Sequence, residues 1–377
     1  MTAAEIAFWV CAALLVYAQA GYGVVLAGLS RLRRAPAPAP EAGELPAVSL
    51  VVAAYLEAEV IAAKVANLRA QDYPADRVEV IVSTDGSTDG TPQRAREAGA
   101  DLVVENARGG KVRTQDAAVR RARHPIVAFS DANSTWEPGA LRELVGAFAD
   151  PRVGYACGQV RFVGAGGTNQ EGVYWRYEMW LRGLESRLAS VTAGNGAIYA
   201  TRREAYLEVD PVMGHDLSFP FNMVKRGWRA VYAPTARATE KMVPSLEGEF
   251  ARKRRMMSHT WPIVLRGGML SPRGYGPLYG LMIASHRLLR YASPFLHAAA
   301  LGLNVALVVA GAGPVYVVTL AAQLLLVAAA LLARVVPARP LLVARYYVLT
   351  TASVAGGLWD WLRHGTPAGW DPAEGTR

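Results

Sequence analysis

Three short apolar runs, each followed at once by polar or acidic residues, most constrain how this chain can fold. The runs are residues 48–53 (VSLVVA), 80–82 (VIV) and 124–129 (HPIVAF). Their β-branched residues are typical of buried strands in a parallel sheet. Helical patterns lie between and beside them, at residues 59–71, 92–98 and 111–123. The alternation of strands and helices predicts an α/β domain with a parallel sheet.

The residues that follow these strands predict a ligand site at one edge of the sheet. In open α/β sheets the ligand binds outside the carboxyl ends of the strands. Those ends carry AYLE at 54–57, STDGSTDGT at 83–91 and SDAN at 130–133. Carboxylates gathered there suit Mg²⁺ or Mn²⁺ holding a diphosphate, because these ions take oxygen ligands. For residues 83–91 alone, a solvated turn with a helix N-cap at Thr88 or Thr91 is the alternative.

Over about residues 46–265 the order and spacing of motifs resemble those of the family 2 glycosyltransferases. This inverting group includes the hyaluronan, chitin and cellulose synthases. The matching segments are AAYLEAE at 53–59, STDGSTDGT at 83–91, GGK at 109–111, SDAN at 130–133, GNGAIYATRRE at 194–204 and GHD at 214–216. The resemblance implies a GT-A domain, which is a Rossmann-like fold that binds nucleotide sugars.

The same resemblance assigns roles to individual residues. It implies that the donor is bound by Ala54, Tyr55, Glu57, Asp85, Lys111 and Asp131. Asp85 would contact the base or ribose, Lys111 the diphosphate, and Asp131 the nucleotide or a metal ion. Asp216 would be the catalytic base. From the residues alone Asp216 also fits an N-cap or first-turn acid, because it opens the amphipathic stretch 217–226.

Two departures from the family pattern affect the metal site and the product. Asn133 stands at the second position of the usual Asp-x-Asp, so we expect a metal ion to be held by Asp131, Asn133 and His215. The processive synthases carry Gln-x-x-Arg-Trp, whereas the nearest segment here, RKRRM at 252–256, lacks both the glutamine and the tryptophan. This difference favours transfer of one or a few sugars over synthesis of a long polymer.

A further group of residues is expected to meet the acceptor or the diphosphate: Asn195, Arg252, Arg255 and Trp261. The glycines on both sides of Asn195 permit close approach of the backbone to a sugar, although a plain turn before a strand is the alternative. For the two arginines the alternative is a solvated basic face.

Long apolar segments at both ends predict a membrane protein. Residues 4–29 exceed the roughly 20 apolar residues that a span needs, and basic residues follow them at 31, 33 and 34. By the positive-inside rule this places the next domain in the cytoplasm and the N-terminus outside. Residues 291–312, 314–336 and 341–362 are expected to cross as well, which would leave the C-terminus outside. The mixed segment 267–290 is typical of an interfacial helix.

The predicted organisation follows from these patterns. It comprises an anchor (1–30), an Ala/Pro-rich linker (31–46), a cytoplasmic catalytic domain (47–265), interfacial helices (266–290), membrane helices (291–364) and a tail (365–377). The net charge of +9 concentrates at the membrane borders, which favours anionic lipids and phosphorylated substrates over nucleic acid. Cys11 and Cys157 lie on different sides of the linker and predict neither a disulfide nor a zinc site.

We therefore expect a multi-pass cell-membrane enzyme that transfers a hexosyl or N-acetylhexosaminyl group. The donor would be a nucleotide sugar, with a UDP-sugar expected first, and the acceptor a saccharide or a polyprenyl-linked sugar. Its role would lie in cell-envelope or exopolysaccharide synthesis, and an oligomer is compatible with the pattern. The alternatives are a processive polysaccharide synthase and, from another class, a nucleotide-binding membrane scaffold with a degenerate site.

Overall fold

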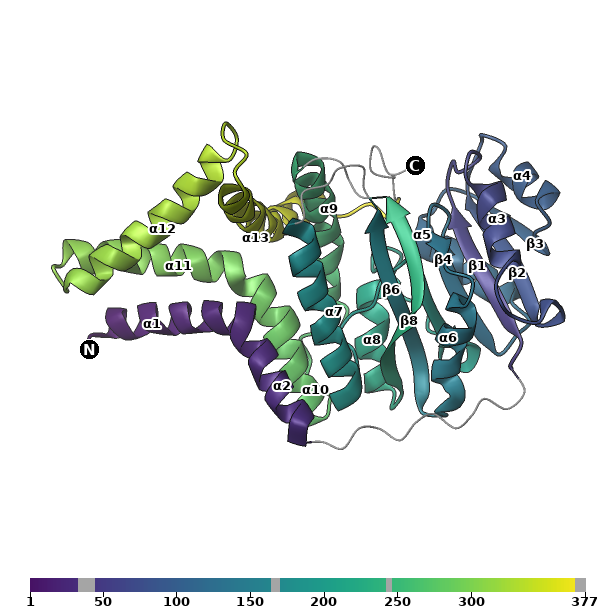
Figure 1. The fold of residues 1–377 in the computed structure, drawn as a ribbon, viewed down its shortest axis with the longest axis horizontal. Coiled ribbons are helices and arrows are strands. Elements are labelled where there is room, and N and C mark those ends of the chain that lie inside the picture. The colour runs from purple at the N-terminus through teal and green to yellow at the C-terminus, as the bar shows by residue number, and fades with distance from the viewer. Residues whose placement is uncertain (33–44, 164–169, 242–245, 370–377) are drawn as a thin grey trace.

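The fold is built around one mixed sheet with the apolar helices gathered at one end of it (Figure 1). The computed structural model describes residues 1–32, 45–163, 170–241 and 246–369. The sheet has eight strands in the order β3-β2-β1-β4-β7-β6-β8-β5. The linker predicted at 31–46 lies largely outside the described residues.

The first half of the sheet confirms the alternation expected from the sequence. Parallel pairing joins β3 to β2, β2 to β1 and β1 to β4. The bounds are β1 Val48–Ala54, α3 Ile61–Arg69, η2 Ala75–Arg77, β2 Val78–Asp85, α4 Thr91–Glu97, β3 Leu102–Asn106, α5 Lys111–Arg121 and β4 Ile126–Asp131. Strand β3 was not predicted. It lies at the edge of the sheet and none of its residues is fully buried, so it lacks the apolar run that marks the central strands.

The second half of the sheet is mixed. Strand β7 pairs antiparallel with both β4 and β6, while β6 and β8 run parallel. The bounds are β5 Thr135–Trp136, α6 Ala140–Gly146, η3 Ala147–Ala149, β6 Val153–Val163, α7 Gln170–Leu188, β7 Ile198–Arg202, η4 Arg203–Ala205, α8 His215–Lys225, β8 Arg229–Lys241 and α9 Leu246–Leu265. Helices α7, α8 and α9 lie between the sheet and the apolar helices (Figure 1).

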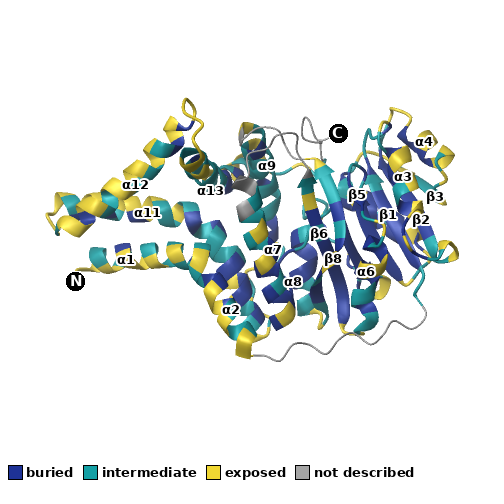
Figure 2. Cartoon of the chain, viewed as in Figure 1, coloured by how far each residue is buried: buried dark blue, intermediate teal, exposed yellow. Residues whose placement is uncertain are grey.

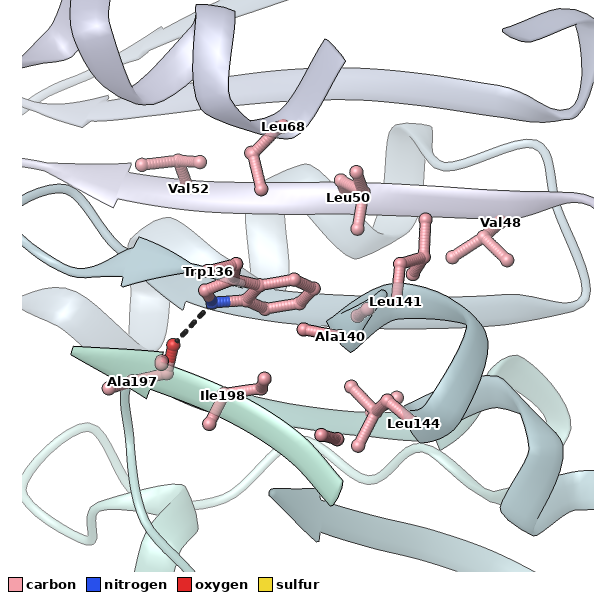
Figure 3. Packing of buried hydrophobic residues seen from close by; sticks show 14 of the residues in the cluster. Val48, Leu50, Val52, Leu68, Trp136, Ala140, Leu141, Leu144, Ala197 and Ile198 are labelled. Carbon is pink, nitrogen blue, oxygen red and sulfur yellow. Dashed lines mark hydrogen bonds between the residues drawn. The ribbon is translucent and has the colours of Figure 1, made fainter. Parts of the chain in front are cut away.

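The core beside β1 and β4 fixes the ends of the central strands. Figure 3 shows the indole of Trp136 among Leu50, Leu141 and Ile198, with its Nε1 donating to the carbonyl of Ala197 at 3.0 Å. Trp136 is 1% exposed, and the hydrogen bond satisfies the one polar group that its burial would otherwise leave unpaired. The contact anchors β5, which carries Trp136, against the start of β7.

Four helices of the described residues are long and apolar enough to cross a membrane: Ala3–Leu32, Pro277–Val309, Pro314–Leu332 and Arg339–His364. The first comprises α1 Ala3–Val16, η1 Tyr17–Gly21 and α2 Tyr22–Leu32, and the third is α12 Pro314–Leu332. Figure 2 shows that α1, α11 and α12 are widely exposed, and their exposed side chains include Val10, Val309, Val318 and Leu325. Such apolar surface indicates association with a membrane.

The segment expected to be interfacial, 266–290, continues in its second part into a long helix. From Pro277 the chain forms α10 Pro277–Met282, η5 Ile283–Leu288 and α11 Leu289–Val309 without a break. The charged residues that suggested an interface, His286 and Arg287, lie on the π-helical turn and are paired inside the protein. Because His286 and Arg287 have partners inside the protein, both can lie within the first half of the long helix Pro277–Val309.

The last apolar segment, which was expected to cross the membrane, forms the last of these four helices, and the residues after it contact the catalytic domain. Helix α13 Arg339–His364 packs along α9, with Arg345 pairing with Glu247 near one end and Asp360 with Arg254, at 2.6 Å, near the other. Beyond it, Thr366 Oγ1 donates to the carbonyl of Ser258 at 2.8 Å. The described C-terminal residues therefore return to the catalytic domain, because charged partners on α9 hold α13 along its length.

Candidate active site

A cavity of about 1530 Å³ joins the carboxyl ends of the strands to the apolar helices. Its wall at the sheet includes Lys111, Asp131, Asn195, Asp216 and Glu240. Its other wall is formed by α7, α9, α11 and α13, through residues such as Tyr174, Lys253, Arg290, Tyr346 and Thr350. Ligands reaching the strand ends would therefore share one cavity with groups from the apolar helices.

Asp85, at the end of β2, organises the loop that precedes α5. Its carboxylate accepts hydrogen bonds from the N–H groups of Gly109, at 2.6 Å, and Gly110, at 3.0 Å, and pairs with Arg108 at 3.0 Å. Gly110 has φ +95°, and a Cβ there would lie 2.1 Å from the carbonyl oxygen of Ala368. Glycine is thus required both by the backbone conformation and by the chain packed against it.

The other predicted nucleotide residues surround this loop. The guanidinium of Arg108 lies 3.2 Å from the ring centroid of Tyr55, which places that ring beside Asp85. The N–H of Glu57 donates to Thr91 Oγ1 at 2.9 Å, and Ser87 Oγ donates to the carbonyl of Ala54 at 3.4 Å. Hydroxyls of the 83–91 segment therefore hold the end of β1 in place, and the structure brings Ala54, Tyr55, Glu57 and Asp85 together.

Lys111 and Asp131 form an ion pair at the centre of the sheet edge. Lys111 is the first residue of α5 and Asp131 the last of β4, so the ends of two elements fix both groups. Burial opposes the charge on Lys111, but Asp131 outweighs it and raises the pKa of the ammonium. Glu240, at the far end of β8, is a third charged group here, and burial followed by the charge of Asp131 raises its pKa to about 7.

Asp216 lies in the first turn of α8, directly on the cavity wall. Burial raises the pKa of its carboxyl group, and the nearby Lys111 opposes that shift. A Cβ at Gly214 would lie 2.7 Å from Asp216 Oδ1, so a side chain there would meet the carboxylate. A partly desolvated carboxylate with a raised pKa is the kind of group that accepts a proton near neutral pH.

His215, the neighbouring residue, has one ring nitrogen available. Its Nδ1 lies 2.8 Å from the Tyr199 hydroxyl, and its ring stacks on Phe219 at 4.0 Å. Its Nε2 is buried and has no hydrogen-bond partner among the described residues. Burial, helped by Lys111, lowers its pKa to about 3, so the ring is neutral at physiological pH, and a neutral imidazole can ligate a metal ion through the nitrogen that carries no proton.

The described residues fit a divalent cation only in part. Among them no group of three or more His, Cys, Asp or Glu side chains is placed to hold a metal ion. Asp131 and His215 both line the cavity, whereas Asn133 is not part of its lining. Asp131 and His215 are thus the two predicted metal ligands that line the cavity, and a bound diphosphate would have to supply more.

The loop before β7 forms the floor of the cavity beside Lys111. Asn195 is held by two bonds, donating from Nδ2 to the carbonyl of Gly158 at 2.7 Å and accepting from the N–H of Ile198 at 2.9 Å. A Cβ at Gly196 would lie 3.2 Å from Lys111 Nζ. The loop is therefore a tight turn that also faces the cavity.

The remaining predicted acceptor residues lie on α9 and differ in their surroundings. Arg252 lines the cavity and pairs with Glu249 at 2.7 Å, whereas Arg255 and Trp261 do not line it. Trp261 packs against Tyr291 and Phe295 and donates from Nε1 to the carbonyl of Val354 at 3.0 Å. Its indole therefore joins α9 to the apolar helices.

Sequence reasoning missed several residues of this cavity: Tyr174, Glu178, Glu240, Arg290 and Tyr346. Strand β8 runs to Lys241, and Glu240 lies at its end. An acidic residue at the end of this strand could have been found by the rule used for Asp85 and Asp131. The others come from three helices far apart in sequence, and no local pattern connects them.

Residues 49–209 match the protein family described as Glycosyl transferase family 2. This segment, which is less than half of the chain, is similar to that family, and the sheet is GT-A-like. The solved structure of the mannosyltransferase PcManGT from Pyrobaculum calidifontis, in complex with GDP-Man and Mn²⁺, has 25% sequence identity and a TM-score of 0.74. The similarity covers 95% of this chain and 99% of that one.

Curated relatives are also glycosyltransferases by name. A beta-monoglucosyldiacylglycerol synthase of Synechocystis is 34% identical over 161 residues, which are 39% of this chain and 33% of that protein. An N-acetylglucosaminyltransferase of Mesorhizobium japonicum is 26% identical over 242 residues, covering 57% of this chain and 56% of that protein. The chain thus spans less than two thirds of the length of these relatives.

Proposed function

We propose that this chain is a membrane-bound inverting glycosyltransferase that moves a hexosyl or N-acetylhexosaminyl group from a nucleotide sugar to an acceptor held at the membrane. The observation that carries the proposal is the single cavity in which Asp216 and Asp131 face groups from α11 and α13. A donor at the strand ends and an acceptor from the bilayer would meet there. The acceptor class is a saccharide or a polyprenyl-linked sugar.

In this proposal Asp216 is the catalytic base. Its carboxylate takes the proton of the acceptor hydroxyl while the oxygen attacks the anomeric carbon in line. The bond to the nucleoside diphosphate breaks on the opposite face, which inverts the configuration. The raised pKa of Asp216 matches this role, because burial makes its carboxylate a stronger base.

Lys111, at the sheet end of the cavity, would stabilise the negative charge of the leaving diphosphate. Lys111 is placed there by the N-terminus of α5, and release from Asp131 would free its ammonium for the diphosphate. Asp131, Asn133 and His215 are the residues that we propose to meet a Mg²⁺ or Mn²⁺ ion. Such an ion, when bound, would offset negative charge on the diphosphate. Arg252, beside Glu240, would contribute to the same balance.

Two lines of support point to different donor nucleotides. The motif resemblance favours a UDP-sugar, whereas the PcManGT structure contains GDP-Man. Tyr55 beside Arg108 offers a flat surface for either base, so both donors belong in the first test.

We further propose that the product is short. Met256 lines the cavity where processive synthases place tryptophan, and Trp261 is engaged in helix packing. Among the described helices α13 packs along α9. The helices that extend away from the catalytic domain are therefore α1, α11 and α12 (Figure 1). The alternative, a processive polymer synthase, would need further helices from other copies.

The orientation proposed from the sequence has the catalytic domain in the cytoplasm and the N-terminus outside. Arg31 in the last turn of α2, on the domain side of the first apolar helix, supports it. The hydrogen bond from Thr366 to the carbonyl of Ser258 supports a position on the domain side for the described C-terminal residues, in place of the outer side first expected.

The experiment that tests the function is nucleotide release from a panel of UDP- and GDP-sugars by the full chain reconstituted with membrane lipids. Sugar-dependent release with label transferred to an acceptor would support the proposal. Binding without turnover for the whole panel would favour a nucleotide-binding scaffold.

A further inference from the structure

The membrane end of the cavity contains an arginine whose hydrogen-bonding capacity is only half used. Arg290, in the first turn of α11, pairs through Nη1 with Glu178 and donates to the Tyr174 hydroxyl at 3.0 Å. Its Nε and Nη2 are buried and have no hydrogen-bond partner among the described residues. Because a guanidinium stays protonated and buried donors are costly to leave unpaired, these two nitrogens indicate a missing acceptor.

The unused pair of nitrogens has a specific geometry. Nε and Nη2 form one edge of the guanidinium, and the two N–H groups on that edge are parallel. Such an edge matches two oxygens of a phosphate or carboxylate. Arg290 lines the cavity, so an anion inside the cavity is the partner that this edge would take.

A second cation lies near the same tyrosine and comes from a different helix. Lys253 of α9 lines the cavity and donates from Nζ to the Tyr346 hydroxyl at 2.9 Å. Its Nζ lies 5.5 Å from the ring centroid of Tyr174, and the guanidinium of Arg290 lies 5.8 Å from the same centroid. Glu249 is a partner of Lys253 at 3.4 Å but does not line the cavity. The ring of Tyr174 is therefore close to two cations, one from α9 and one from α11.

The two ends of the cavity differ in charge. At the sheet end three carboxylates, Asp131, Asp216 and Glu240, line the wall with three cations, Lys111, Arg182 and Arg252, whereas the membrane end combines Glu178 with four cations, namely Lys253, Arg287, Arg290 and Arg339. The excess of positive charge at the membrane end attracts a ligand whose anionic group points away from the catalytic base. Apolar residues of α13, Leu342 and Val343, continue the wall beyond the basic end.

We propose that Arg290 and Lys253, with Tyr174 close to both, bind the phosphate of a lipid-borne acceptor. This deepens the proposed function and rests on it, because it names the chemical group by which the acceptor is held. The chain of the lipid would leave the cavity past α13, and the group to be glycosylated would extend toward Asp216. The donor's own diphosphate has a separate cation at the sheet end, in Lys111.

A direct test measures lipid binding by the purified full chain in neutral detergent micelles. The probes are phosphatidic acid, diacylglycerol of the same chain length and inorganic phosphate. For the wild type we expect phosphatidic acid to bind at least about tenfold more tightly than diacylglycerol, the size of one good charge-assisted contact. Inorganic phosphate should compete weakly, because it lacks the lipid chain.

Two variants and a matched control locate the site. Arg290→Lys keeps the charge beside Glu178 but removes the parallel pair of N–H groups, and Lys253→Met removes the second cation. Each should reduce the preference for phosphatidic acid by about threefold or more while leaving donor binding unchanged. Arg254→Lys changes the neighbouring residue on α9, whose partner is Asp360 outside the cavity, and should keep the preference.

The outcomes separate this inference from the proposed function. An unchanged preference in both variants, or no preference in the wild type, would overturn the phosphate site even if sugar transfer is found. Equal affinity for inorganic phosphate would show a free-anion site instead of a lipid site. If the lipid preference behaves as expected but no nucleotide sugar reacts, the proposed function fails while the phosphate site stands.

Discussion

The two ends of the cavity are built in different ways. At the sheet end, Lys111, Asp131 and Asp216 are each fixed at the terminus of a strand or helix, so the backbone determines where the side chain lies. At the membrane end, Arg290 is positioned by packing between helices that are distant in sequence. The sheet end is therefore encoded locally in the sequence, whereas the membrane end depends on how the apolar helices pack.

The largest effect is expected at Asp216. Asp216→Asn preserves the size of the side chain but removes the base, so turnover should fall at least ~10²-fold while donor affinity stays nearly the same. Steady-state nucleotide release and donor titration on the same preparation check both halves. Near-normal turnover in a folded variant would show that Asp216 is not the catalytic base. The proposal that the sheet end of the cavity is the catalytic end would then also be wrong.

Asp131 should affect binding in addition to turnover. Asp131→Ala removes a cavity carboxylate and leaves Lys111 without its partner, so we expect weaker donor binding and a reduced response to Mg²⁺ or Mn²⁺. Asn133→Asp is the companion variant, which should strengthen metal dependence if residue 133 reaches the ion. Activity that is indifferent to a chelator would contradict the metal part of the account.

Asp85 tests how far the loop before α5 controls the donor site. Asp85→Ala leaves the N–H groups of Gly109 and Gly110 without their acceptor, and donor affinity should fall by about tenfold as the loop loosens. Asp72→Ala is the control, because Asp72 is 69% exposed and pairs with Arg142 on the surface. Calorimetric titration of both variants makes the comparison. Equal affinities would show that the loop is held by other contacts.

The strands and the sheet-end residues could be predicted because each depends on a few neighbouring positions. Apolar runs such as 80–82 predicted strands such as β2. The polar residues that follow these runs identified Asp85 and Asp131 as candidates at the strand ends. Strand β3 was missed because an edge strand needs no continuous apolar run.

The side of the sheet that faces the membrane was less predictable. Hydropathy identified α13 as a span, but its ion pairs with α9, through Arg345 and Asp360, decide where it lies. Likewise Arg290 and Tyr174 meet only after α7 and α11 pack together. Contacts between distant helices depend on tertiary packing, which single-sequence periodicity does not contain.

The smallest expected effect lies away from the cavity and concerns stability. Burial raises the pKa of Asp116 to about 6, while the Tyr206 hydroxyl donates to its Oδ1 at 2.6 Å. Folding favours the protonated carboxyl group of Asp116. Its contribution to the free energy of unfolding is therefore complete below the unfolded pKa of about 4 and is lost as the pH rises through about 6. Asp116→Asn should therefore raise the unfolding temperature at pH 7 but not near pH 4. An equal shift at both pH values would contradict the burial argument.

The most direct test of the account is transfer of radiolabelled sugar by the full chain in lipid nanodiscs that contain extracted membrane lipids. Label should pass from a UDP- or GDP-sugar into a low-mass, lipid-extractable product with inverted anomeric configuration, and Asp216→Asn should abolish it. A high-mass ladder formed without added acceptor would show a processive synthase. Release of free sugar with no labelled lipid would contradict the claim that one cavity joins the donor site to a membrane acceptor.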